Sequence, residues 1–103
     1  MERVQIDREK LAQFCREHRI TRLALFGSVL RPDFSPDSDV DVLVQFAPDA
    51  HYGLLTVSRI QRELSRIFGR EVDLVEWEAV ERSRNYIRRE AILGSLEVIY
   101  EDR

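Results

Sequence analysis

Two aspartates alternate with valines where an apolar segment of the chain begins, in the sequence SDVDVLV of residues 38–44. Because successive side chains of a strand point to opposite faces, Asp39 and Asp41 would share one face and the valines the other. Asp73 lies in a similar segment, VDLV of residues 72–75, and would join that face if the two strands are neighbours. Carboxylates a few ångströms apart repel by about 1 kcal/mol in water and by more near a protein, so such a cluster requires protons or cations. Mg²⁺ fits this need because it takes one or two carboxylates together with substrate phosphates.

Two other interpretations of these aspartates are a structural turn and a calcium loop. Aspartates next to proline and serine are common in turns, where they accept hydrogen bonds from the local backbone. Residues 33–41 also place oxygen-bearing side chains at the odd positions of an EF-hand loop. That loop requires glycine at its sixth position and glutamate at its twelfth, where this chain has Ser38 and Val44. The sequence therefore excludes the EF-hand and leaves the turn as the alternative to a metal site.

Helical and strand patterns alternate along the chain. Helices are expected over residues 7–18, 53–68 and 78–93, and strands over residues 21–26, 40–46, 71–75 and 96–100. Asp7 is suited to cap the first helix, Gly69 ends the second and Gly94 ends the third. This alternation predicts one α/β or α+β domain formed by residues 1–103, with helices packed on one face of a small sheet.

Composition narrows the class of protein further. The net charge of −3 provides no overall basic field, which argues against direct binding to nucleic acid or to an anionic membrane. No apolar stretch approaches the roughly 20 residues of a membrane span. Cys15 is the single cysteine, so the chain has no internal disulfide, and a reducing cytoplasm is the expected compartment. Cys15 falls on the apolar stripe of the first helix and is interpreted as a packing residue.

The order of these features resembles the minimal nucleotidyltransferase (MNT) family of the DNA polymerase beta-like nucleotidyltransferase superfamily. A strand runs into Gly27-Ser28, an arginine-containing loop follows, Ser38-Asp39-Val40-Asp41 opens the next strand, and Asp73 lies in a later one. The resemblance covers almost the whole chain and implies a small mixed β-sheet with its active site on the open face. One departure is that Leu30-Arg31-Pro32 stands where the family has Ala-Arg-Gly, so the arginine is kept and the glycine is not.

The resemblance also implies roles for individual residues. Nucleotide phosphates would contact Gly27 and Ser28, with Arg31 and Ser38 as further nucleotide-binding residues. Asp39 and Asp41 would hold two Mg²⁺ ions, and Asp73 would complete the metal and catalytic site. These roles agree with physical chemistry, since glycine lets the backbone approach a triphosphate and two metals stabilise the attacking and leaving oxygens of an in-line displacement.

Short members of this family resemble the antitoxin half of HEPN–MNT toxin–antitoxin pairs, in which the MNT protein transfers AMP from ATP to a tyrosine of a HEPN ribonuclease. The resemblance therefore implies a protein adenylyltransferase whose acceptor is presented in trans, because 103 residues leave no separate acceptor-binding domain. Two alternatives stay open: an antitoxin that inhibits its partner by binding alone, and a nucleotidyltransferase that acts on a small molecule or RNA. The arginines of the last helix, at 82, 84, 88 and 89, would contact nucleotide or partner, or pair with neighbouring glutamates.

Overall fold

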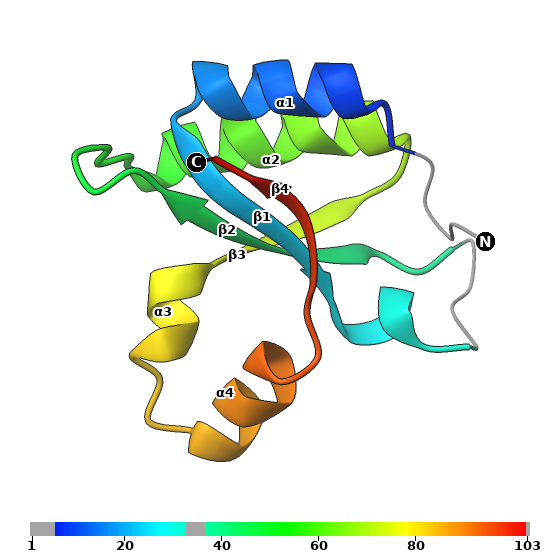
Figure 1. Cartoon of the computed structure of the whole chain (residues 1–103), viewed down its shortest axis with the longest axis vertical. Helices are drawn as coiled ribbons and strands as arrows, with labels where there is room; N and C mark the ends of the chain where they lie inside the picture. Colours follow the sequence, from blue (N-terminus) through cyan, green and yellow to red (C-terminus); the bar gives the residue numbers. More distant parts are fainter. Residues whose placement is uncertain (1–5, 33–36, 103) are drawn as a thin grey trace.

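The computed structural model describes residues 6–32 and 37–102, which form a mixed four-stranded sheet between two groups of helices (Figure 1). The strand order is β3-β2-β1-β4; β2 and β3 are parallel, and β1 is antiparallel to both of its neighbours. The expected α+β fold with a small mixed sheet is confirmed. The elements are α1 (Arg8–Glu17), β1 (Ile20–Phe26), the 3₁₀ helix η1 (Gly27–Leu30), β2 (Val40–Phe46), α2 (Leu54–Phe68), β3 (Val72–Glu76), α3 (Trp77–Glu81), α4 (Tyr86–Leu93) and β4 (Glu97–Glu101).

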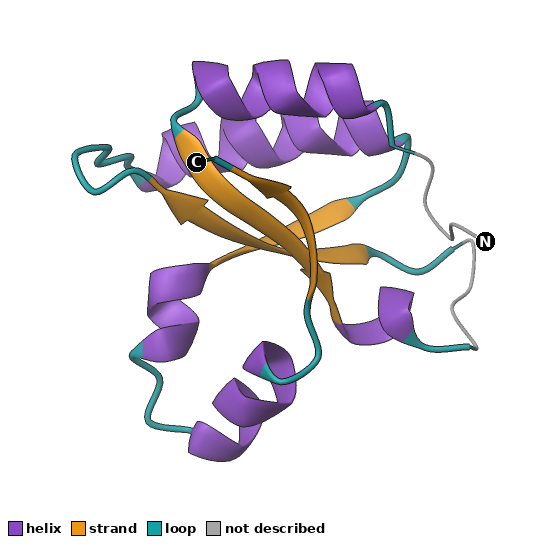
Figure 2. Ribbon diagram, in the orientation of Figure 1, coloured by secondary structure: helices purple, strands orange, loops and turns teal. Residues whose placement is uncertain are grey.

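Helices α1 and α2 lie side by side over one face of the sheet, where the larger core forms (Figure 2). The predicted cap of α1 is confirmed, because Asp7 Oδ1 accepts hydrogen bonds from the amides of Glu9 and Lys10 at 3.1 and 3.2 Å. The valines of β2 are buried in this core, together with Ile60, Leu64 and Phe68 of α2 and Leu11, Phe14 and Cys15 of α1. The face assigned to the valines is therefore the helix-covered face, as the alternation predicts.

The second face of the sheet is not fully open, which differs from the prediction. Ala24, Phe26 and Leu43 on this face pack with residues of α3 and α4, namely Trp77, Val80 and Ile92. The reason is topological: a parallel crossover is right-handed, and the chain moves across the sheet in opposite directions from β2 to β3 and from β3 to β4. The first crossover places α2 above the sheet, and the return crossover must then place α3 and α4 below it.

The helix expected over residues 78–93 is also two helices rather than one. Ser83 Oγ accepts a hydrogen bond from the Asn85 amide at 3.2 Å, and Asn85 Oδ1 accepts one from the Arg88 amide at 3.1 Å. These local bonds compete with helix continuation and cap the start of α4. At the start of α3, the Arg22 guanidinium of β1 lies 4.0 Å from the centroid of the Trp77 ring. This cation–π contact joins α3 to β1.

Two further expectations concern single features of the chain. Cys15 is fully buried, and this burial raises the pKa of its thiol from 9.0 to about 12, which leaves it protonated and unreactive at neutral pH. The interpretation of Cys15 as a packing residue is confirmed. Among the residues that the structure describes, no helix is both long and apolar enough to cross a membrane.

Candidate active site

The pairing of β2 with β3 brings two of the predicted carboxylates together. Asp41 and Asp73 are direct partners in the parallel register, on strands that lie about 4.8 Å apart. Both belong to the face opposite the valine core, because Leu43 and Val75, two residues further along each strand, pack in the second core with α3 and α4. The adjacency expected from the sequence is confirmed.

Asp39 lies directly before β2 and two residues before Asp41, so the strand alternation, continued by one residue, predicts the same face for both. Asp39 and Asp73 are exposed, whereas Asp41 is half-buried. The three carboxylates therefore lie at the end of the sheet where β2 and β3 begin, and an external molecule can reach two of them. We call this group the carboxylate face.

Gly27 follows the last residue of β1 and lies beside the carboxylate face. Phe26 pairs with Asp41 in the antiparallel register, so Gly27 leaves the sheet directly beside that aspartate. Its φ is +73°, in the left-handed region, and a β-carbon built on it would lie 2.5 Å from Asp41 Oδ2. The absent side chain at Gly27 is therefore what makes room for the Asp41 carboxylate. The backbone then continues into η1, which begins at Gly27 and includes Ser28.

The other predicted nucleotide-binding residues differ in their exposure and contacts. Ser38 is half-buried, and its carbonyl oxygen accepts a hydrogen bond of 2.9 Å from Arg70 Nη2. Arg31 is exposed just after η1. Residues 33–36, which hold Asp33 and Ser35 of the excluded calcium loop, lie outside the described residues. The nucleotide-binding roles of Ser28, Arg31 and Ser38 stay predictions.

Arg70 is a residue that the sequence analysis missed. It lies between the end of α2 and the start of β3, in the segment Gly69-Arg70-Glu71, where a charged residue usually serves only solubility. The signal that it leaves in the sequence is its position directly before the strand that carries Asp73. In the folded chain, its long-range hydrogen bond to the Ser38 carbonyl connects it with the segment that precedes Asp39.

The donor atoms of the carboxylate face suit Mg²⁺ when it arrives with a nucleotide. Within residues 6–32 and 37–102, no group of three or more His, Cys, Asp or Glu side chains is arranged to hold a metal ion alone. Mg²⁺ does not need such a cage, because it is usually held by one or two carboxylates and by substrate phosphates. Asp41 beside Gly27, with exposed Asp39 two residues away, supplies carboxylate oxygens for a metal ion that arrives with substrate phosphates.

The arginines of α3 and α4 divide between structural contacts and the solvent. Arg82 pairs with Glu78 at 2.6 Å on the exposed side of α3, as the glutamate-pairing alternative predicts. Arg89 Nη1 donates to the carbonyl oxygens of Glu81 and Ser83 at 3.5 and 3.3 Å, near the end of α3. Such contacts satisfy carbonyls that a helix end leaves without partners. At least two of the four arginines therefore make contacts within the protein itself.

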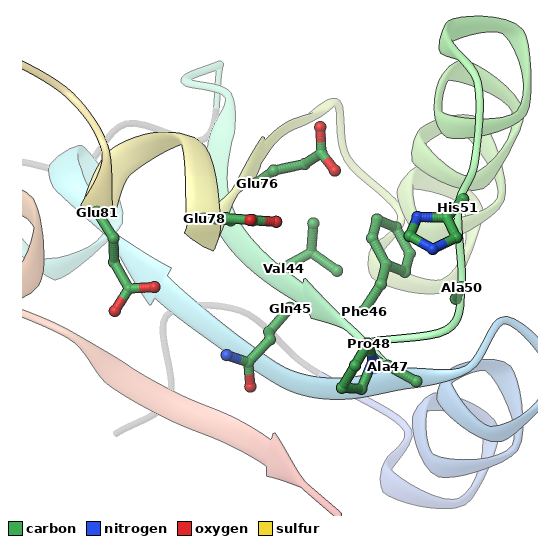
Figure 3. A pocket seen from close by; sticks show the side chains of 10 residues that line it. All are labelled: Val44, Gln45, Phe46, Ala47, Pro48, Ala50, His51, Glu76, Glu78 and Glu81. Atoms are coloured by element: carbon green, nitrogen blue, oxygen red, sulfur yellow. The ribbon is translucent and has the colours of Figure 1, made fainter.

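A hollow of about 450 Å³ lies at the opposite end of β2 from the carboxylate face (Figure 3). It forms where β3 ends at Glu76, opposite Val44, while β2 continues to Phe46. Its lining includes the acidic residues Glu76, Glu78 and Glu81 and the imidazole of His51, around apolar residues of β2 and of the loop that follows it. The hollow thus shares no lining residue with the predicted site and is chemically different from a phosphate-binding surface.

Comparisons with known proteins agree with this geometry. The profile of a family described as "Nucleotidyltransferase domain" matches residues 8–94. A candidate protein adenylyltransferase of Methanocaldococcus jannaschii is 30% identical over 73 residues, which are 71% of this chain and 76% of that protein. A solved candidate minimal nucleotidyltransferase is 31% identical, with a TM-score of 0.64 over 87% of this chain and 86% of its own.

More distant solved structures share the fold. A toxin–antitoxin structure with AMP-PNP aligns with a TM-score of 0.68 at 16% identity, over 95% of this chain and 76% of that chain. A complex of a tri-AMPylated Shewanella oneidensis HEPN toxin with its MNT antitoxin aligns with a TM-score of 0.60 at 18% identity, over 92% and 70% of the two chains. The chain belongs to the nucleotidyltransferase domain family, as its aspartate pattern predicts, and it is a nucleotidyltransferase.

Proposed function

We propose that this chain is a Mg²⁺-dependent protein adenylyltransferase that transfers AMP from ATP to a tyrosine hydroxyl of a partner HEPN toxin and thereby neutralises it. The observation that carries the proposal is the register that places Asp41 beside Asp73 on one face, with Gly27 against the Asp41 carboxylate. The relatives described above add the substrate class, because their names include protein adenylyltransferase, AMP-PNP and an AMPylated toxin.

The reaction assigns a task to each part of the carboxylate face. The phenolic oxygen of the acceptor attacks the α-phosphorus of ATP and forms the new O–P bond, while the bond from this phosphorus to the bridging oxygen breaks and pyrophosphate leaves. Asp73, which lies on the edge strand β3, takes the phenolic proton, a transfer that typically contributes about 10²–10⁴ in rate. Gly27 and the backbone of η1 approach the phosphates, and Asp39 and Asp41 hold Mg²⁺. When bound, this ion neutralises the charge that develops on the phosphate oxygens.

Exposed apolar side chains favour a protein as the acceptor. Tyr86 and Ile87 at the start of α4 are 60% and 72% exposed, and Leu54 and Leu55 at the start of α2 are 84% and 82% exposed. Neighbouring exposed apolar residues of this size are typical of protein contacts. Helix α4 packs on the same sheet face as the carboxylates, so a partner seated on Tyr86 and Ile87 would approach that face.

The test combines transfer with neutralisation. The chain is incubated with ATP labelled at the α-phosphate, Mg²⁺ and the protein encoded beside it, and the adenylylated residue is located by mass spectrometry. We expect one or more tyrosines of the partner to carry AMP and the partner's ribonuclease activity to fall. An Asp41→Asn variant that neutralises the partner as well as the parent does, without transfer, would instead support inhibition by binding alone. Label transferred only to RNA or to a small molecule would support the remaining alternative.

A further inference from the structure

Polar side chains that lie behind the carboxylate face hold the backbone segments from which the carboxylates project. Two of them, Gln61 and Ser65, come from α2, one helical turn apart on the same side of the helix. The third, Arg70, follows the end of α2. All three are half-buried. Gln61 and Ser65 accept hydrogen bonds from main-chain amides of β3, and Arg70 donates one to the main-chain carbonyl of Ser38.

The first contacts fix the edge strand that carries Asp73. In the described sheet β3 pairs only with β2, so every second amide of β3 points away from the sheet. Those of Val72 and Leu74 donate to Ser65 Oγ and to Gln61 Oε1, each at 3.0 Å. These two residues flank Asp73 on both sides. The strand is therefore held from its open edge at the two positions next to the predicted proton acceptor.

A separate contact fixes the segment that carries Asp39. Arg70 Nη2 reaches across 32 residues of sequence to the Ser38 carbonyl at 2.9 Å. The Val40 amide donates to the Glu71 carbonyl at 2.9 Å, so the same two segments are joined again by the backbone. Arg70 thus ties the peptide before Asp39 to the start of β3, where no further strand pairing would define its place.

We propose that Arg70 and Gln61 are positioning residues for nucleotidyl transfer, with separate effects. Arg70 sets the Asp39–Asp41 segment and therefore governs binding of the metal–nucleotide complex. Gln61 fixes the position of the β3 backbone next to Asp73 and therefore governs activation of the acceptor. The split rests on the roles given to the carboxylates in the proposed function. Because a displacement of about 1 Å at a reacting group can cost about 10²-fold in rate, a contact behind the site can affect catalysis strongly.

The variants are chosen so that geometry and hydrogen bonding are separated. Gln61→Leu keeps similar bulk and removes the acceptor, whereas Gln61→Glu keeps an acceptor oxygen for the Leu74 amide. Arg70→Ala removes the donor, whereas Arg70→Lys keeps a donor of similar reach without the planar fork of arginine. Arg62→Ala, at an exposed position next to Gln61 on α2, controls for a general effect of altering this helix.

Three measurements on the full chain test the proposal. Amide hydrogen exchange should become faster at Leu74 in Gln61→Leu and return toward the parent rate in Gln61→Glu. The Kd for AMP-PNP with Mg²⁺ should rise about tenfold in Arg70→Ala and stay within about threefold of the parent in Gln61→Leu. The kcat for transfer to the partner should fall about 10–100-fold in Gln61→Leu with little change in the KM for ATP. Arg62→Ala should match the parent in all three measurements.

The pattern across variants decides the outcome. If Gln61→Leu and Arg70→Ala change AMP-PNP binding and kcat alike, in proportion to their loss of thermal stability, both residues are merely structural and the proposal is wrong. Unchanged exchange at Leu74 in Gln61→Leu would also overturn it. A parent chain that transfers no AMP would overturn the proposed function instead, while the exchange and AMP-PNP measurements would still test the positioning.

Discussion

Replacing Gly27 with alanine tests whether the space beside Asp41 is essential to the site. Two costs are expected. The left-handed backbone at φ +73° costs a residue with a β-carbon about 1–2 kcal/mol of folding stability. In addition, the new β-carbon would lie 2.5 Å from Asp41 Oδ2, whereas ordinary contact begins at 3.4 Å, so the carboxylate must retreat by about 0.9 Å.

The chain contains a matched control for the first of these costs. Gly69, which ends α2, has a φ of +68°, and a β-carbon built there meets nothing within 4 Å. Gly69→Ala should therefore lose a similar 1–2 kcal/mol of stability, on the order expected from backbone strain alone. Its effect on activity should be smaller than that of Gly27→Ala, because the new β-carbon does not meet the Asp41 side chain. The comparison isolates the displacement of the Asp41 carboxylate from general destabilisation.

The assays are urea unfolding, AMP-PNP binding with Mg²⁺ and transfer from labelled ATP. We expect Gly27→Ala to reduce transfer about 100-fold and Gly69→Ala to reduce it less than about threefold, at a temperature where both are folded. Stability should also show coupling, since Asp41→Ala removes the two nearest atoms that the new β-carbon meets and should lower the cost of Gly27→Ala. Equal transfer by the two alanine variants would refute the idea that Gly27 makes room for a functional carboxylate.

Further predictions concern the carboxylates and the buried thiol. Asp39→Asn should abolish transfer while unfolding stability stays within about 0.5 kcal/mol of the parent, because Asp39 is exposed; a large loss in urea unfolding would mark it as a structural cap. Asp73→Asn should keep most AMP-PNP binding in calorimetry and lose about 10²–10⁴ in the transfer rate, so loss of both together would contradict its role as proton acceptor. For Cys15, the pKa of the thiol is about 12 in the folded chain and has its ordinary value of 9.0 in the unfolded chain. Above pH 9 the unfolded chain therefore binds fewer protons than the folded one. The free energy of unfolding should then decrease with rising pH in the parent more than in Cys15→Ala, by up to about 1.4 kcal/mol per pH unit. Unfolding of both proteins between about pH 8 and 11 measures this difference.

The faces of β2 and β3 could be predicted from the sequence because the pattern of each strand is local. Valine and aspartate alternate with the period of a strand, and only one assignment of faces buries the valines. The pairing of β2 with β3 needed one further assumption, that the two strands are neighbours. The structure confirms that assumption in the register of Asp41 with Asp73.

The position of α3 and α4 could not be predicted in the same way. Trp77, Val80 and Ile92 show that this region has an apolar side, but they do not say which face of the sheet it covers. That choice follows from the strand order, since the return crossover from β3 to β4 must pass on the side opposite α2. Strand order is a property of the whole fold, and no short segment encodes it. The break between α3 and α4, in contrast, has a local signal in the sequence, because Ser83 and Asn85 are residues that favour helix capping.

The mixed directions of the strands explain why the site forms at this end of the sheet. Ligands of open parallel sheets usually bind beyond the carboxyl ends of the strands, whereas here the aspartates lie where β2 and β3 begin. Because β1 is antiparallel to β2, its carboxyl end meets this same edge, and Gly27 leaves β1 directly beside Asp41. An all-parallel sheet would place the glycine turn and the aspartates at opposite ends. The antiparallel β1–β2 pair therefore brings Gly27 and the start of η1 to the same end of the sheet as Asp39 and Asp41. The parallel β2–β3 pair adds Asp73 to this group.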